Sequence, residues 1–341
     1  MKVVCICDAA VPEMLMQYMK KLPGCDVTLH TEKSLLDIKS LTKVERMAEL
    51  QGAEACPVSD ELLEAVRDAE ILVTHVTPVN RKVLDAAPNL KVIGVLRTGT
   101  ENVNTELCRE RGIAVYNAEG RNSTAVADIV VALMICEMRN IARAHMALVN
   151  GKWIKMFPNI MMNRDMRRCT VGIIGVGKIG TMVAARLRGF ECRILGCDIY
   201  LSPEEITARG CEPVSKEELL KRSDFITIHM RHEAGQPPLI GVNELALMKK
   251  NAILVNCARA GLVDTNALIE ALRARSIGGA VIDVFDEEPL SPDSPLLTLD
   301  NVTLTPHIAG TTVDAFANSV EIMLRQLTQL LSGEEPRNRV V

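Results

Sequence analysis

The stretch from Val171 to Gly180, which reads VGIIGVGKIG, constrains the fold of this chain more than any other. It opens with four mostly apolar residues, as expected of a strand buried on both faces of a sheet. Glycines follow at the spacing G-x-G-x-x-G, and apolar residues then recur near helical spacing. A strand, a glycine turn and a helix in this order are typical of a dinucleotide-binding unit.

Each glycine has a physical role in such a unit. Gly175 permits the tight turn out of the strand, and Gly177 has no Cβ atom, so a pyrophosphate can approach the backbone. Gly180 lets the helix pack close to the sheet, and the helix N-terminus offers N–H groups to the phosphates. Because this spacing also occurs in ordinary turns, the residues that come after it decide its meaning.

The next apolar run, Arg193 to Cys197, ends at Asp198, about 20 residues after the glycines. A carboxylate at this position accepts hydrogen bonds from the adenosine ribose and repels a 2′-phosphate. No arginine follows directly, since Ile199 and Tyr200 come next. We therefore predict NAD rather than NADP as the cofactor; the alternative is that Asp198 is only a turn residue.

The composition limits the class of protein. A chain of 341 residues is long enough for two domains with separate cores. Its 48% apolar and 24% charged residues are ordinary for a globular protein. Its net charge of −4 is not the basic charge that is typical of nucleic-acid-binding proteins. The N-terminus does not resemble a signal peptide, and the most apolar helical stretch, Ile129 to Cys136, is too short to span a bilayer. We therefore expect a cytoplasmic protein that binds neither membranes nor nucleic acid.

The 11 cysteines are scattered, with no C-x-x-C pair and no spacing typical of zinc ligands. Several of them, such as Cys5, Cys7, Cys197 and Cys257, fall in expected strands. We interpret them as reduced, mostly buried thiols, and we expect no metal site.

Strand and helix signals alternate along most of the chain, which predicts parallel sheets with helices on both faces. In residues 1–118 the expected strands are 3–7, 26–30, 71–75, 91–96 and 113–117, and the helical patterns are 11–22, 43–50 and 60–68. From residue 171 the expected strands are 171–174, 193–197, 224–229, 252–256, 279–284 and 302–305. The expected helices there are 178–189, 217–222, 242–250, 265–275 and, at the end, 311–331.

Residues 117–122 read NAEGRN, a turn-rich break where we place the crossing between two domains. The pattern over 124–150 is apolar on much of its surface, which predicts one long helix that is buried or covered in a subunit interface. Before the break, Thr98-Gly99-Thr100 follow a strand. A glycine there suits either a close backbone approach to a ligand or a plain turn.

Three polar residues stand at or just beyond expected strand ends in the second half: Arg259, Glu288 and His307. The carboxyl ends of parallel strands share one edge of a sheet, so the three can converge beside a bound nicotinamide. Hydride transfer to a 2-keto acid needs a cation for the carboxylate and a proton donor for the keto oxygen. Arginine and histidine supply these, and a carboxylate behind the histidine fixes its tautomer. Taken singly these residues also fit structural roles, which is how we interpret His30, His75, His145, His229 and His232.

Together the motifs resemble those of the D-2-hydroxyacid dehydrogenase family, which includes D-3-phosphoglycerate dehydrogenase. The chain carries N-x-x-R-x-G-x-V-D at 256–264, D-V-F-x-x-E-P at 283–289 and T-P-H-I-x-G at 305–310, in the family's order. The resemblance covers essentially the whole chain. It implies an α/β fold of two Rossmann-like domains. A doubly wound NAD-binding domain, 119–308, is inserted into a smaller flavodoxin-like substrate domain, 1–118 plus 309–341.

The resemblance also implies roles for the motif residues. Arg259 would bind the substrate carboxylate, His307 would be the general acid and base, and Glu288 its partner. The implied cofactor contacts are Gly175, Gly177, Lys178, Ile179, Gly180, Asp198, Cys257, Ala258, Asp283, His307 and Gly310, with Asp283 near the nicotinamide carboxamide. The implied substrate loop is Arg97, Thr98, Gly99 and Thr100, whose backbone amides hold the carboxylate.

Some positions depart from the family pattern. Glu101 stands where the substrate loop usually has a second glycine, Val103 where it has aspartate, and Ala260 where glycine is common. The segment 230–240 lacks the usual proline and threonine beside the cofactor. Formate dehydrogenases carry glutamine in place of Glu288, so formate is not expected as a substrate. No regulatory domain is recognised, so we expect no feedback control by a serine-binding module.

The leading hypothesis is an NAD-dependent enzyme that interconverts a small 2-keto acid and its D-2-hydroxy acid. As is usual in the family, we expect a homodimer formed through the 124–150 helix. The alternative is an NADH-sensing interaction protein on the same fold, like the family's transcriptional corepressors. The absence of long disordered tails in this sequence disfavours that alternative. The chemical group beyond C3 of the substrate, and whether it is phosphorylated, stay open at this point.

Overall fold

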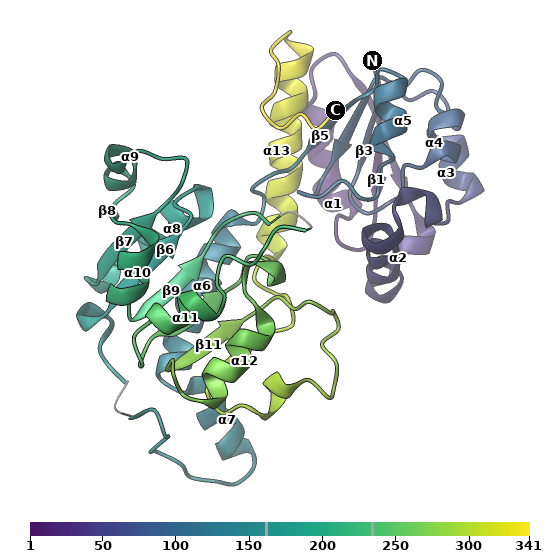
Figure 1. The fold of residues 1–341 in the computed structure, drawn as a ribbon. Coiled ribbons are helices and arrows are strands. Elements are labelled where there is room, and N and C mark those ends of the chain that lie inside the picture. Colours follow the sequence, from purple (N-terminus) through teal and green to yellow (C-terminus); the bar gives the residue numbers. More distant parts are fainter. Residues whose placement is uncertain (161–162, 233–234) are drawn as a thin grey trace. The chain divides into compact units, whose positions relative to one another are not determined.

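The computed structural model describes residues 1–160, 163–232 and 235–341, which form two compact units (Figure 1). The first unit joins Met1–Asn122 to Thr312–Val341, and the second is Ser123–Thr311. The second unit is therefore an insertion in the sequence of the first. The chain passes between the units within a few residues of the expected boundaries at 118 and 309.

The first unit is built on a parallel sheet with the strand order β2-β1-β3-β4-β5. Its strands are β1 (Lys2–Cys7), β2 (Asp26–Thr31), β3 (Ile71–Thr74), β4 (Val92–Val95) and β5 (Ala114–Asn117). Its helices are α1 (Glu13–Met16), α2 (Ile38–Gln51), α3 (Asp60–Ala65), α4 (Arg81–Ala86), α5 (Thr105–Glu110) and α13 (Val313–Leu331).

The prediction of one helix over 11–22 was wrong. After α1 the chain tightens into a 3-10 helix over Gln17–Lys21, and Leu22 is extended, with φ −61° and ψ 124°. Pro23 follows Leu22, and a proline disfavours the helical conformation of the residue before it.

Helix α13, at the other end of the sequence, completes the core of the first unit. Its side chains Val320, Met323 and Leu327 are buried with strand residues of β1, β3 and β4. The contact with β4 is close, because a Cβ atom on Gly94 would lie 2.6 Å from the Met323 sulfur. A side chain at this position would force the Met323 side chain to move.

The second unit has a seven-stranded parallel sheet in the order β12-β11-β10-β9-β6-β7-β8. Its strands are β6 (Thr170–Ile174), β7 (Arg193–Cys197), β8 (Glu212–Pro213), β9 (Phe225–Ile228), β10 (Ile253–Asn256), β11 (Gly279–Ile282) and β12 (Val302–Leu304). Its helices are α6 (Ser123–Met138), α7 (Ile141–Val149), α8 (Lys178–Leu187), α9 (Pro203–Ala208), α10 (Lys216–Arg222), α11 (Val242–Leu247) and α12 (Thr265–Arg273). The strand order reverses between β6 and β9, where ligands bind in sheets of this kind.

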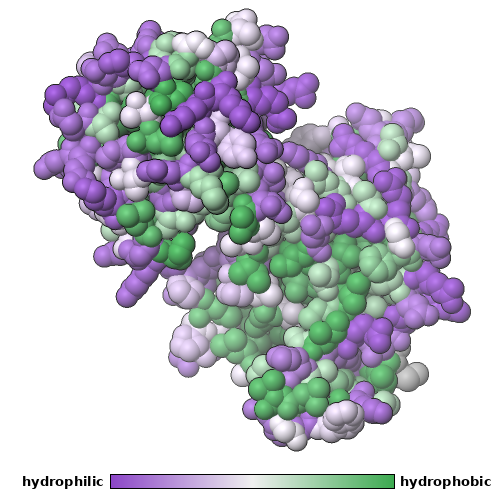
Figure 2. Space-filling view, turned by 180° about the vertical axis from the view of Figure 1, so that it is seen from behind, coloured by the Kyte–Doolittle hydropathy of each residue, from purple (hydrophilic) through white to green (hydrophobic). Residues whose placement is uncertain are grey.

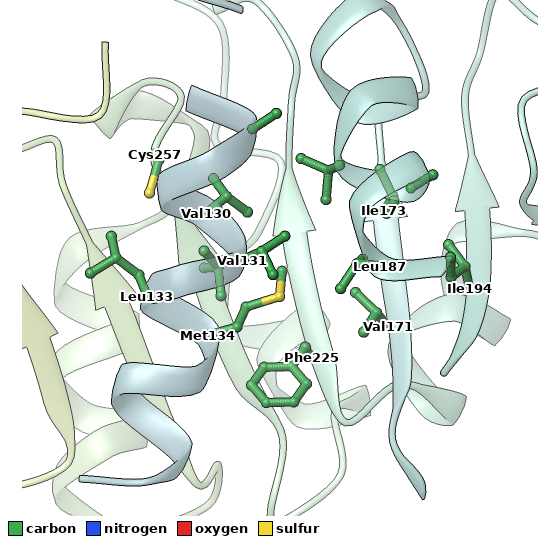
Figure 3. Close-up of a cluster of buried hydrophobic side chains, with 14 of the residues drawn as sticks. Val130, Val131, Leu133, Met134, Val171, Ile173, Leu187, Ile194, Phe225 and Cys257 are labelled. Carbon is green, nitrogen blue, oxygen red and sulfur yellow. The ribbon is translucent and has the colours of Figure 1, made fainter. Parts of the chain in front are cut away.

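Helix α6 lies over one face of this sheet and supplies the centre of its core (Figure 3). The cluster joins α6 to β6, α8 and β9, and includes Val130, Val131, Met134, Val171, Leu187 and Phe225. Burying a side chain of this size contributes roughly 1.5–3 kcal/mol. Most residues of the helix are buried or partly buried within the second unit, and Thr124, Asp128 and Ala132 form its exposed stripe.

The prediction of one helix over 124–150 was also wrong, since α6 and α7 are separate helices. They meet at Asn140, whose φ of 55° lies in the left-handed region. The Asn140 amide donates to Oδ1 of Asn159 at 2.6 Å and accepts from Arg143 at 3.0 Å. Asparagine adopts this conformation more readily than most residues, and these bonds hold it there.

No helix in the described ranges has the length and apolar character needed to cross a bilayer. All 11 cysteines are free thiols, and most of them are buried.

Candidate active site

The expected site residues of the second unit stand at the carboxyl edge of its sheet, because each follows the end of a strand. Gly175 follows β6, Asp198 follows β7, Cys257 follows β10, Asp283 follows β11 and His307 comes after β12. Lys178 and Ile179 form the first turn of α8. The sheet therefore brings residues that lie far apart in the sequence to one edge.

The glycine motif has the shape that its spacing predicts. At Gly175 φ is +89°, and a Cβ atom there would lie 2.5 Å from the His229 carbonyl oxygen. A Cβ atom on Gly180 would overlap the Gly175 carbonyl, so α8 approaches the strand end only because Gly180 has no side chain. At Gly177, the N-cap of α8, nothing lies within 4 Å of the Cβ position. The space in front of this backbone is open to a phosphate.

Asp198 supports the glycine loop directly. Its Oδ2 accepts the Val176 amide at 2.8 Å, and its Oδ1 accepts the Tyr200 amide at 2.9 Å. Each carboxylate oxygen has a second lone pair, which is free to accept from a ribose hydroxyl. Asp198 therefore stabilises the turn, as the alternative interpretation of this residue proposed. It also keeps the capacity to bind a ribose.

His307 and Glu288 form a hydrogen-bonded pair. Nδ1 of His307 lies 2.8 Å from Oε2 of Glu288, whose Oε1 accepts the Phe285 amide at 3.0 Å. Because the carboxylate accepts a hydrogen bond from the Nδ1–H group, Nε2 is the ring atom that this pair leaves without a partner. The His307 side chain is 52% exposed, and its Nε2 has no hydrogen-bond partner among the described residues.

The backbone at His307 is held in an uncommon conformation, with φ 55°. Asp283, fully buried, fixes the turn: its carboxylate accepts the Thr305 hydroxyl at 2.5 Å and the amides of residues 308 and 309 at 2.9 Å each. The His307 amide also donates to the Thr305 carbonyl at 3.0 Å. Gly310 follows this turn directly. The orientation of His307 therefore depends on a carboxylate that does not contact its ring.

Arg259 projects from the turn after β10. The Asn256 side chain donates to the Arg259 carbonyl at 2.8 Å and accepts the Ala258 amide at 3.1 Å, so the turn is fixed from inside. Nη1 of Arg259 donates to the Ala258 carbonyl at 2.7 Å. The side chain is exposed, and no carboxylate of the described residues pairs with it. Its remaining donors are free to bind an anion.

Two residues beside the turns, Cys257 and His229, are uncharged at neutral pH. Burial, together with the negative charge of Asp283, raises the pKa of the Cys257 thiol to about 12, so the thiol stays protonated at neutral pH. Burial lowers the pKa of His229 to about 4, so its ring is neutral beside Gly175.

The substrate loop expected at 97–100 belongs to the first unit and follows β4. Arg97 is buried, and its Nη2 lies 2.7 Å from Oε1 of Glu49 and 3.1 Å from Oε1 of Glu45, both on α2. The Glu101 carboxylate folds against Gly99, where a Cβ atom would otherwise stand. Glu101, which stands where the family usually has glycine, therefore covers one side of this loop.

Two groups of contacts had no signal in the sequence. One is the pairing of Arg97 with Glu45 and Glu49. The other is a second carboxylate–histidine pair, in which Oδ2 of Asp8 lies 3.0 Å from Nδ1 of His75, both buried at the carboxyl edge of the first sheet. Of the atypical 230–240 segment, residues 233 and 234 lie outside the described residues.

Comparison with known proteins gives a consistent result. A family model described as "D-isomer specific 2-hydroxyacid dehydrogenase, NAD binding domain" matches residues 131–309. That range covers most of the second unit, which carries the glycine motif, Arg259 and His307.

Two curated relatives extend the similarity to most of the chain. D-3-phosphoglycerate dehydrogenase of Methanocaldococcus jannaschii is 41% identical over 300 residues, which are 87% of this chain and 56% of that protein. Glyoxylate reductase of Korarchaeum cryptofilum is 36% identical over 306 residues, which are 89% of this chain and 92% of that protein. The chain thus spans about half the length of the first relative and nearly all of the second.

Among solved structures, a D-isomer specific 2-hydroxyacid dehydrogenase from Lactobacillus delbrueckii ssp. bulgaricus, in its NAD-complexed form, has a TM-score of 0.78 at 23% identity. The match covers 100% of both chains. At this identity the similarity concerns the fold, and it confirms the expected α/β architecture of two parallel sheets, one unit being inserted in the other.

Proposed function

Because this chain belongs to the D-isomer specific 2-hydroxyacid dehydrogenase family, we propose that it interconverts a small 2-keto acid and its D-2-hydroxy acid with NAD as the cofactor. The second unit would hold the cofactor, and the first unit would supply the 97–100 loop to the substrate. The observation that carries the proposal is the His307–Glu288 pair, which stands on the sheet edge that also carries the glycine motif and Arg259.

The residues of this edge fit the chemistry of keto-acid reduction. The unpaired guanidinium of Arg259 binds the substrate carboxylate, where a planar fork makes two parallel hydrogen bonds. Nε2 of His307 donates a proton to the keto oxygen, and Glu288 stabilises the ring while it is charged. A bound nicotinamide would supply the hydride.

The chain also fits the cofactor. The open space at Gly177 and the first turn of α8, at Lys178 and Ile179, suit a pyrophosphate. Asp198 suits the two ribose hydroxyls of NAD and opposes the 2′-phosphate of NADP. Asp283 and Ala258 border the position proposed for the nicotinamide.

The proposed function is tested by following NADH oxidation with a panel of keto acids that includes glyoxylate, hydroxypyruvate and 2-ketobutyrate. We expect at least one to be reduced to the D-enantiomer wherever the product is chiral. NADH binding without turnover of any keto acid would contradict the proposed dehydrogenase activity and favour the NADH-sensing alternative. Formation of the L-enantiomer would contradict the proposed reaction.

Replacing Asp198 by alanine should narrow the preference for NAD over NADP about tenfold, because a like charge no longer faces the 2′-phosphate. Competitive titration of the two cofactors measures this ratio. Asp198→Asn is the matched control for the turn, since it removes the charge but keeps one oxygen for the Val176 amide, with only the bond from the Tyr200 amide lost. Tighter binding of NADP than of NAD by the wild-type protein would contradict the assignment.

We further propose a homodimer, formed through α7 and the segment that comes after it. Apolar side chains are exposed along this stretch, among them Met146 (57%), Val149 (67%), Trp153 (80%) and Met156 (69%). In the space-filling view hydrophobic residues gather at the end of the second unit that carries α7 (Figure 2). Contiguous exposed apolar side chains of this kind mark protein interfaces.

Light scattering at micromolar concentration should therefore give the mass of two chains. The double variant Met146→Glu, Trp153→Glu should be monomeric with an unchanged circular dichroism spectrum, since both side chains are exposed and bury nothing within the chain. A monomeric wild-type protein, or a double variant that stays dimeric, would rule out this interface.

A further inference from the structure

A cavity of about 360 Å³ lies in the first unit, beside α2 and α3 (Figure 1). Besides α2, three stretches of the chain line it, within residues 32–35, 57–62 and 77–78. All of them belong to the first unit, so the cavity is complete without the second. Its volume falls in the range of roughly 300–1,000 Å³ that is typical of small-molecule sites.

This cavity is separate from the 97–100 loop. Helix α2 lines the cavity with Lys43 and Met47 and contacts Arg97 with Glu45 and Glu49. An α-helix has about 3.6 residues per turn, so residues two apart point to nearly opposite sides. The face of α2 that lines the cavity is therefore opposite to the face that holds Arg97.

One buried polar group of the cavity lining lacks a partner. Thr77 is only 2% exposed, and its hydroxyl oxygen makes no hydrogen bond with any described residue. Buried polar groups in proteins are nearly always paired, and a hydroxyl can both donate and accept. The Thr77 hydroxyl therefore indicates a polar group that binds in the cavity.

Glu32 places a buried negative charge in the lining. Its Oε1 accepts the Ser34 amide at 3.2 Å and the Ser34 hydroxyl at 2.7 Å, and its Oε2 accepts the Ser59 hydroxyl at 2.7 Å. Burial opposes the charge of Glu32, but these hydrogen bonds outweigh it and hold the pKa of the carboxyl below its usual range. Glu32 forms no ion pair with a described residue, and Oε2 keeps one lone pair for a further donor.

Lys43 places a positive charge at the rim of the same cavity. Its side chain is exposed, and it forms no ion pair within the parts of the chain that the structure describes. The rest of the wall is mostly apolar and includes Leu35, Val44, Met47, Val58 and Leu62. The cavity thus offers one anion, one cation and an apolar surface to a ligand.

We propose that this cavity binds an α-amino acid with an apolar side chain. Its ammonium group would donate to Glu32, its carboxylate would face Lys43, and one of the two would pair with the Thr77 hydroxyl. A simple cation would leave Lys43 unmatched, and a simple anion would leave the buried charge of Glu32 unmatched. The inference does not depend on the dehydrogenase activity, because none of these residues belongs to the candidate active site.

The test is calorimetric titration of the full chain with L-leucine, L-methionine and L-phenylalanine, of which at least one should bind. The amino acid that binds is then compared with the amine and the acid that each lack one of its charges. For leucine these analogues are 3-methylbutylamine and 4-methylpentanoate. Each analogue should bind about tenfold more weakly or worse, as expected when a charge-assisted hydrogen bond is lost.

Two variants place the ligand in the cavity. Lys43→Glu should weaken binding about tenfold, because it replaces an attraction for the carboxylate by a repulsion. Lys39→Glu, at an exposed position of α2 outside the lining, is the matched control and should bind as the wild type does. Thr77→Val keeps the side-chain shape and should weaken binding about two- to tenfold, the contribution of one hydrogen bond. It should not lower the melting temperature, since the hydroxyl bonds to no described residue.

Circular dichroism establishes that each variant is folded, and Lys43→Glu leaves the core untouched because the lysine is exposed. Failure of all three amino acids to bind would overturn the inference. Binding of the amine or the acid as tight as that of the amino acid would also overturn it, by removing the need for a zwitterion. Affinity that is unchanged in both Lys43→Glu and Thr77→Val would place the amino acid elsewhere on the chain. An equal loss in Lys39→Glu and Lys43→Glu would likewise reject the site, since it would show only an effect of net charge.

Discussion

Replacing His307 by asparagine should lower kcat for keto-acid reduction by about 100- to 10,000-fold, the usual contribution of a positioned general acid. Asparagine is the suitable substitute because it tolerates the left-handed backbone, φ 55°, better than most residues. The His307 side chain is half exposed, so little packing is lost. Since asparagine has no proton to give at the position of Nε2, the loss should appear in the chemical step.

Single-turnover oxidation of bound NADH measures that step, and NADH titration shows that the variant still binds the cofactor. His145→Asn, at an exposed position of α7, is the control for the loss of a histidine and should keep the wild-type rate. A His307→Asn variant that retains more than about a tenth of the single-turnover rate would exclude His307 as the proton donor.

Arg259→Lys should keep the fold and the cofactor but lower kcat/KM on the best keto acid by about 10- to 150-fold. Lysine keeps the charge but cannot form two parallel bonds to a carboxylate. A charge-assisted hydrogen bond contributes roughly 1.5–3 kcal/mol, and ~1.4 kcal/mol corresponds to a factor of ten. If part of the interaction forms only in the transition state, kcat falls as well as the affinity for substrate.

The matched control is Arg273→Lys, on the exposed end of α12, where the arginine pairs with Glu270. Surface pairs of that kind contribute under ~1 kcal/mol, so its kcat/KM should stay near the wild-type value. NADH affinity should change little in either variant. An Arg259→Lys enzyme with wild-type kcat/KM would show that the exposed guanidinium does not bind the substrate.

The sequence predicted the strands of the second unit well except for β8, because the other strands are mostly apolar runs with a turn residue after them. The expected strand at 193–197 coincides with β7, and the expected strand at 252–256 begins one residue before β10. The strand β8 has only Glu212 and Pro213, which is too short to show any alternation. The division at Asn140 was missed because apolar periodicity continues on both sides of it.

Within the candidate site, the contacts implied by the family motifs were predictable, and the contacts outside those motifs were not. The partnership of His307 with Glu288 follows from the order of two motifs at neighbouring strand ends. The contact between Arg97 and Glu49 depends on where α2 docks, which is decided by packing rather than by local pattern. Likewise Asp8 and His75 are 67 residues apart, and only the pairing of β1 with β3 brings them together.

The packing of α13 against β4 sets the order in which the two units can mature during synthesis. Residues 1–122 leave the ribosome first, but the side chains that complete their core, such as Met323 and Leu327, belong to residues 312–341. The second unit is one uninterrupted segment, and domains of that kind fold as they emerge. The unit that is synthesised first therefore completes its folding last. A nascent chain halted before residue 312 would carry a finished second unit beside an open apolar sheet, the form most exposed to aggregation and most in need of a chaperone.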